Sequence, residues 1–193
     1  FADNVVGPAG ITPQAKTSDP EWNETAEAWW GEWSKACDIR QRVNMRELQR
    51  GIVQARLLSG DCGFVLIDNG QLQPIEGERI DTPSRLSNDR AIIEGVRVDA
   101  GTGIPLSFCV LPRDDSGMAD QSADGEWVPR ENFVFMMRPL RFDQVRGIPD
   151  LAPVVNALVD HKELAESMLA RAKLDASNAV FVGRPGGAGT GLG

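Results

Sequence analysis

The longest regular pattern in this sequence is helical and runs from Asp150 to about Asn178. Apolar or small side chains recur every three or four residues along it, as they do on one stripe of a helix. A helix of that length spans roughly 43 Å at ~1.5 Å per residue. Alanines in the far half of the stripe favour close packing against parallel neighbouring helices over the wrapping of a compact core. The predicted contact face consists of Leu151, Val155, Leu158, His161, Ala165 and Ala172.

The segment Arg146-Gly147-Ile148-Pro149 directly precedes this pattern. Gly147 permits a sharp turn out of the last predicted strand, and Pro149 fixes φ in the first helical turn. Arg146 is placed to pair with a carboxylate of its own or of a neighbouring subunit. We therefore predict that Arg146, Gly147 and Pro149 form a structural hinge and helix start, which gives the long helix a defined exit angle.

Two shorter helices are predicted near the N-terminus. Asp19-Pro20-Glu21 supplies an N-cap, a helix-starting proline and an acidic first turn. Asn44 and Glu47 have the spacing of a capping box, and Gly60 ends the helix that they begin. The first helix carries a tryptophan stripe among glutamates, which favours a core or subunit-contact role over a base-stacking platform. The two inner faces are Ala26, Trp29, Trp30, Trp33 and Cys37, and Met45, Leu48, Ile52 and Ala55.

Between about Asp61 and Leu140 the pattern changes to short strands separated by turns. Asn69-Gly70 is typical of a type I′ hairpin turn, and the segment from Asp99 to Gly103 joins two further strands. The predicted strands are residues 64–67, 72–75, 92–98, 106–111 and 133–137.

The predicted fold class is α+β, with a helix pair packed on a small antiparallel or mixed β region and followed by one long helix. Four segments follow from this assignment. They are an extended N-terminal segment at 1–20, an α+β domain at 21–142, the long helix with its lead-in at 143–182, and a Gly-rich flexible tail or truncated loop at 183–193.

Charge and residue counts argue against several classes of protein. The net charge of -8 does not suit a chain whose main affinity is for phosphate backbones. Cys37, Cys62 and Cys109 lie far apart in the sequence, and His161 is the single histidine, so neither a zinc site nor a Ser-His-Asp triad is indicated. No apolar run approaches the ~20 residues of a membrane span. We predict no catalytic, metal-binding or cofactor-binding residues and no membrane association.

Acidic residues are the remaining candidates for chemistry. Asp61, Asp68, Asp81, Asp99 and Asp143 supply carboxylates of the kind that magnesium sites and hydrolases use. Most of them lie at predicted turns, where aspartate stabilises the backbone directly. The turn role is favoured, and a hydrolase is the less favoured alternative, because no nucleophile, base and orienting group converge.

Four stretches of the sequence carry a resemblance to a known family. The first is residues 4–7 with 10–11, and the second is Trp33 and residues 37–38 followed by 48–50. The third is residues 95–99 with Gly103, and the fourth is residues 128–129 followed by 144–151. Together they resemble the lambda-family portal proteins of tailed phages, and the last stretch is the most specific. The resemblance covers nearly the whole chain. One departure is the strand at 133–137, Phe-Val-Phe-Met-Met, where the family often has a histidine.

The resemblance implies a structural subunit rather than an enzyme. It implies a homo-oligomeric ring, commonly a dodecamer, at the capsid vertex of the virion, with a channel for genome packaging and DNA ejection. The implied partners are the terminase large subunit, the capsid protein, head-completion or tail connector proteins, and double-stranded DNA that passes without sequence specificity. Assembly would take place in the host cytoplasm.

Within such a ring, residues 2 to about 142 would form the peripheral wing and the helix from Asp150 the first part of the stem. The rest of the stem and the crown would lie beyond residue 193. Lys162, Glu166 and Lys173 are then the candidate channel-facing charges. A defined exit angle would matter in this setting, because small angular errors accumulate around a closed ring. The alternative reading is another phage structural or adaptor subunit.

Overall fold

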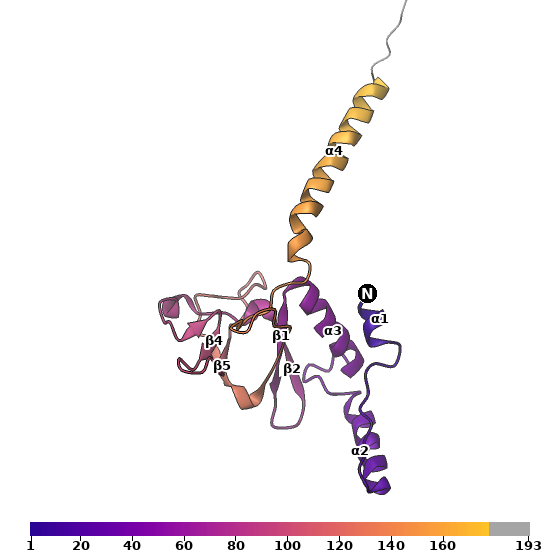
Figure 1. Cartoon of the computed structure of the whole chain (residues 1–193), viewed down its shortest axis with the longest axis vertical. Helices are drawn as coiled ribbons and strands as arrows, with labels where there is room; N and C mark the ends of the chain where they lie inside the picture. Colours follow the sequence, from indigo (N-terminus) through magenta and orange to yellow (C-terminus); the bar gives the residue numbers. More distant parts are fainter. Residues whose placement is uncertain (178–193) are drawn as a thin grey trace, which may run out of the picture. The chain divides into compact units, whose positions relative to one another are not determined.

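The computed structural model describes residues 1–177 and divides the chain into two units, which meet between Ala152 and Pro153. Figure 1 shows helices and short strands in the first unit and the long helix α4 in the second. The predicted α+β class is confirmed. The predicted end of the helical pattern near residue 178, the remainder of the segment to 182 and the Gly-rich segment at 183–193 lie outside the described residues.

The first unit begins with three helices: α1 (Ala2–Val6), α2 (Pro20–Trp33) and α3 (Met45–Leu58). The caps predicted for α2 and α3 are confirmed. The Asp19 carboxylate accepts the backbone N–H of Trp22 at 3.1 Å, and Asn44 and Glu47 form both halves of a capping box. These side chains satisfy backbone N–H groups that a helix start leaves without partners.

The N-terminal segment differs from the extended chain predicted for residues 1–20. Residues 2–6 form α1, because Ala2 and Val6 are buried where this helix packs on α3. An ion pair from Asp3 to Arg50 at 3.0 Å holds the two helices together. The N-terminal segment is thus part of the packed unit.

The first sheet contains three antiparallel strands in the order β2-β1-β7. The hairpin predicted at Asn69-Gly70 joins β1 and β2, and Leu66 pairs with Leu72 across it. Gly70 has a positive φ of 83° but Asn69 does not, so the turn is not the predicted type I′. The strand bounds are β1 (Asp61–Leu66), β2 (Leu72–Glu76) and β7 (Phe133–Met137).

The second sheet contains four antiparallel strands in the order β3-β4-β5-β6. The prediction of one strand over 92–98 was wrong, because Glu94 and Gly95 have positive φ values of 47° and 82° and turn the chain back as a tight hairpin. The strand β6 was not predicted. The bounds are β3 (Ile92–Ile93), β4 (Val96–Val98), β5 (Pro105–Val110) and β6 (Glu126–Pro129).

Alternate residues of β1 face two separate cores. Cys62 and Phe64 contribute to the cluster that α3 covers, together with Leu48 and Cys37. The opposite side of β1 faces the second sheet, where Phe108 stacks on Phe133 at a centroid distance of 4.4 Å. This second core contains Ile75, Ile80, Val96, Val98, Phe108, Val110, Val128 and Phe133. The first unit is therefore built as a helix layer and two sheet layers.

The second unit consists, as far as it is described, of a helix that follows a short 3-10 turn. The turn covers Ala152–Val154, and α4 runs over Val155–Ser177. Regular α-helix therefore begins five residues after the expected start at Asp150. Pro153 explains the delay, because it has no N–H to donate and disfavours helical geometry in the residue before it.

Candidate functional site: the junction ahead of the long helix

The candidate site is the place where the start of β1 meets the chain segment that precedes the second unit. Asp61 is the first residue of β1, and its side chain is 0% exposed. It reaches this position because α3 ends at Leu58 and Gly60, with a φ of +92°, turns the chain directly into the strand. A carboxylate buried to this extent requires a cation and hydrogen-bond donors around it.

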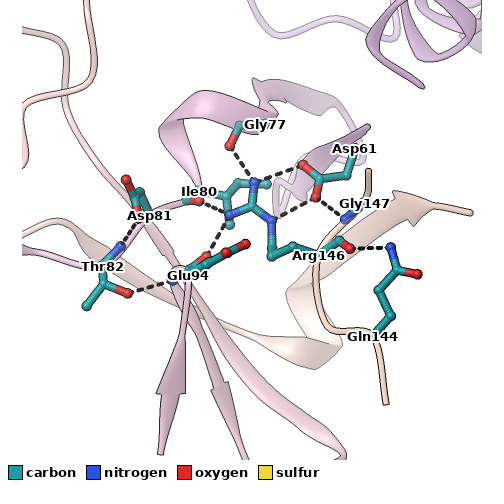
Figure 2. A network of polar contacts seen from close by, with 10 residues as sticks. Asp61, Gly77, Ile80, Asp81, Thr82, Glu94, Gln144, Arg146 and Gly147 are labelled. Carbon is teal, nitrogen blue, oxygen red and sulfur yellow. Dashed lines mark hydrogen bonds and ion pairs between the residues drawn. The ribbon is translucent and has the colours of Figure 1, made fainter. Parts of the chain in front are cut away.

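Arg146 supplies both. Its Nε donates to Asp61 Oδ2 at 2.7 Å and its Nη2 donates to Asp61 Oδ1 at 2.9 Å, which forms a two-pronged ion pair (Figure 2). The Arg146 side chain is itself only 14% exposed. The planar guanidinium binds both carboxylate oxygens through two parallel hydrogen bonds. The ammonium group of a lysine could not make this bidentate contact.

The remaining N–H groups of the guanidinium donate to backbone carbonyls. Nη2 donates to Gly77 at 2.8 Å, and Nη1 donates to Glu94 at 2.6 Å and also to Ile80. All five N–H donors of Arg146 are therefore used. Because Gly77 follows β2 and Glu94 lies in the β3–β4 turn, one side chain joins the two sheets and the segment ahead of α4.

Two glycines, Gly60 and Gly147, allow the backbone ahead of β1 to lie against the backbone that follows Arg146. A Cβ on Gly147 would lie 2.1 Å from the carbonyl oxygen of Gly60, and a Cβ on Gly60 would lie 2.5 Å from Gly147 backbone atoms. The Gly147 N–H donates to Asp61 Oδ2 at 2.7 Å. Gly147 has no positive φ, so it is needed for close approach and not for the sharp turn that was predicted.

The segment around Arg146 is held on both sides. Gln144 donates to the Arg146 carbonyl at 2.6 Å. Further along, the N–H groups of Asp150 and Leu151 donate to carbonyls near the end of α3, each at 3.2 Å, and Asp150 also pairs with Arg56 at 2.8 Å. These bonds satisfy carbonyls that the helix end would leave without partners. The chain is fixed up to residue 151.

Pro149 does not have the position predicted for it. It precedes the 3-10 turn and lies outside the first turn of α4. The segment at 146–149 is consequently a connection held at both ends. Arg146 binds Asp61, and the amide groups of residues 150 and 151, which follow the segment, donate to carbonyls of α3. The predicted role of Arg146, Gly147 and Pro149 in setting the direction of the long helix stays a prediction.

Three of the carboxylates considered as chemical candidates, those of Asp61, Asp81 and Asp99, accept hydrogen bonds within the first unit. Asp61 was assigned to a turn from the sequence, but its oxygens accept three N–H donors in the buried ion pair. Asp99 does cap a turn, where hydrogen bonds from the Thr102 hydroxyl and amide lower the pKa of its carboxyl. Within residues 1–177, no group of three potential ligands is arranged to hold a metal ion.

The cysteine beside the ion pair is enclosed. Burial raises the pKa of the Cys62 thiol to about 11, and the negative charge of Asp61 adds to that effect. A thiol held protonated at neutral pH is a poor nucleophile. Cys62 therefore belongs to the packing of β1 against α3.

Apart from Leu151, which belongs to the first unit, the residues predicted as contact face and channel charges lie along α4. The described part of α4 buries none of its side chains, and Leu158, Met168 and Leu169 are 61%, 64% and 58% exposed. Lys162 and Glu166, which are one helical turn apart, form an exposed ion pair in which Nζ lies 3.8 Å from Oε1. None of the helices within residues 1–177 is long and apolar enough to cross a bilayer.

Comparison with known proteins gives one family. A family model described as "Phage portal protein, lambda family" matches residues 1–192. The chain matches no curated protein. The family match extends over both units and includes the Asp61–Arg146 junction.

Proposed function

This chain belongs to the lambda family of phage portal proteins, and we propose from that membership that it forms a ring around a DNA channel at the capsid vertex. A homo-oligomer, commonly a dodecamer in this family, would conduct the genome during packaging and ejection. The same ring would bind the terminase large subunit, the capsid protein and head-completion or tail connector proteins. It would assemble in the host cytoplasm and remain in the virion. Its role is structural.

The observation that carries this proposal is the exposed apolar stripe of α4. Within residues 153–177, no other element of the second unit covers Leu158 and Leu169. Exposed apolar stripes of this kind mark contact surfaces between proteins. Parallel copies of the same helix around a ring would cover the stripe, as expected for the stem of a portal.

Replacing Leu158 and Leu169 with glutamate is expected to prevent ring formation by the full-length gene product. Two charges in the centre of a helix contact would leave carboxylates buried without partners. Light scattering should show a shift from ring to monomer, while the melting temperature of the first unit stays within about 2 °C, since surface changes outside a folded unit cost little.

Leu164→Glu is the matched control for this test. Leu164 is 57% exposed, close to Leu158, but it lies six residues further along α4 and therefore on a different side of the helix. Its replacement is expected to leave the ring intact. Rings that form equally well with glutamate at 158 and 169 would contradict the proposed role of the stripe.

The candidate channel charges Lys162 and Lys173 each follow a stripe leucine by four residues and so border the stripe, and they are tested with Lys162→Gln and Lys173→Gln. We expect the double variant to form rings but to retain less DNA after packaging, because two cationic contacts with phosphates are removed from every subunit. Packaged DNA per particle is the measurement. Arg171→Gln is the control, since Arg171 pairs with Asp175 at 3.8 Å on another side of the helix. Equal DNA retention in all variants would remove these residues from the channel.

A further inference from the structure

One side of α2 carries tryptophans that are largely exposed, although Trp29 stacks on Trp33 at a centroid distance of 5.9 Å. Trp22 and Trp29 are seven residues apart, so they lie on the same side of the helix, and they are 56% and 64% exposed. We call these two residues the Trp face. Glu21 and Glu32 lie beside it along the helix, and Glu32 also forms an exposed ion pair with Lys35 at 2.7 Å. The Trp face is thus a strip of exposed aromatic surface with an acidic border.

The position of α2 explains why these tryptophans are not in a core. The helix has no buried residue, and Figure 1 shows it extending away from the sheets. It is attached near its C-terminal end, where the Trp33 indole N–H donates to the Gly70 carbonyl at 2.8 Å and the Ser34 carbonyl accepts the Met45 N–H at 2.9 Å. Large aromatic side chains left exposed on a projecting helix are typical anchors of protein contacts.

A second exposed surface has the opposite charge. The turn after β7, residues 138–142, reads Arg-Pro-Leu-Arg-Phe, and every one of these residues is exposed. Leu140 is 56% exposed and Phe142 is fully exposed. Among residues 1–177, neither Arg138 nor Arg141 forms an ion pair. We call this segment the basic turn. It combines apolar and cationic groups, which complement the aromatic and acidic groups of the Trp face.

The two surfaces lie at opposite ends of α3. The C-terminal end of α2 is bonded to Met45, at the start of α3, whereas Arg138 lies beside Arg56 and Leu57 around one cavity near its end. A 14-residue helix is roughly 20 Å long at ~1.5 Å per residue. The Trp face and the basic turn of one chain are therefore too far apart to bind each other.

We propose that the Trp face of one subunit binds the basic turn of the next subunit in the ring. The inference rests on the proposed function, since it identifies a contact of that ring. Two different, complementary surfaces on one chain make a head-to-tail contact, and repetition of such a contact closes a ring when the rotation between neighbouring subunits divides a full turn evenly. Within the chain, Arg97 already lies over the ring of Trp127 at 4.4 Å, and the same interaction would join Arg138 or Arg141 to the tryptophans.

The first test is Trp22→Ala with Trp29→Ala in the full-length gene product. Association of subunits is expected to weaken by about tenfold or more, because exposed tryptophans that become buried in an interface are the residues that alanine substitution affects most. Sedimentation velocity over a concentration series gives the association constant. The melting temperature of the monomer controls for folding, and it should change little because neither side chain is buried.

A charge exchange gives the sharper test. One variant carries Glu21→Arg and Glu32→Arg, and the other carries Arg138→Glu and Arg141→Glu. Each variant alone presents like charges at every contact and should not form rings. In an equal mixture, every contact between unlike variants joins opposite charges, so mixed rings in which the two variants alternate should form. Native mass spectrometry measures their composition. Arg90→Glu with Arg130→Glu makes the same change of charge at exposed sites and should assemble normally.

The outcomes separate the inference from the proposed function. Rings formed by either charge variant alone, or no rings in the mixture, would overturn the inference while the unmodified protein still forms rings. Normal rings with alanine at 22 and 29 that fail to bind the capsid protein would assign the Trp face to that partner and also overturn it. If the unmodified protein formed no ring, the proposed function would fail, and the inference with it.

Discussion

Replacing Arg146 with alanine is expected to lower the free energy of unfolding of the chain by about 3–5 kcal/mol. The change leaves the Asp61 carboxylate, which is fully buried, without its cation and with only the Gly147 N–H as a donor. It also leaves the carbonyls of Gly77, Ile80 and Glu94 without the N–H groups that they accept. Because a domain is stable by only about 5–15 kcal/mol, this one change removes much of that stability.

Urea unfolding measures this effect, and Arg113→Ala is the matched control. Arg113 also binds two carboxylates, Glu76 and Glu78, but at the surface, where such pairs contribute about 0–1 kcal/mol. Combining Arg146→Ala with Asp61→Asn should cost less than the sum of the two single changes, since the unpaired charge is then absent. A cost for Arg146→Ala as small as for Arg113→Ala would contradict the assignment of the junction.

The second large effect is expected for Gly147→Ala. The added Cβ would lie 2.1 Å from the Gly60 carbonyl oxygen and 2.9 Å from the Asp61 Cβ. The obstructing group is backbone, and the Gly60 N–H is bonded to the Ala55 carbonyl at 2.8 Å, so it has little freedom to move. Overpacking of this kind costs about 1–3 kcal/mol, and separation of the segments would also weaken the Asp61–Arg146 pair.

Gly51→Ala is the control with an effect of opposite sign. Gly51 lies inside α3, and a Cβ there would meet nothing within 4 Å. Alanine in a helix interior is favoured over glycine by about 1 kcal/mol, so this variant should be more stable than the unmodified chain. Thermal unfolding of the two variants would show melting temperatures that move in opposite directions. A stable Gly147→Ala protein would show that the close approach is not required.

The features that could be predicted from the sequence are those with local causes. The N-caps at Asp19 and Asn44 depend on residues within one helical turn, and the structure confirms both. The failure at 92–98 has a tertiary cause. The apolar side chains at 92, 93, 96 and 98 suit a strand, but Glu94 adopts a positive φ beside Gly95, which lies close against the backbone of Asp81. Tertiary packing therefore decided the turn.

The junction could not be predicted from local patterns. Asp61 and Arg146 are 85 residues apart, and each has an ordinary local interpretation as a turn residue or a helix lead-in. Three of the groups that bind Arg146 are backbone carbonyls, which no side-chain motif identifies. The local signals were Arg146, for which a carboxylate partner was expected but not identified, and the glycines at 60 and 147, whose mutual contact is visible only in three dimensions.

The carbonyl partners of Arg146 have a consequence for how related sequences can diverge. Every amino acid has a backbone carbonyl, so the side chains at positions 80 and 94 can change through mutation while the bonds to the guanidinium persist. The identities that this arrangement constrains are few: aspartate at 61, arginine at 146 and glycine at 60, 77 and 147. Relatives with little overall identity can therefore retain the same connection, and these five positions are where a distant homologue should be aligned first.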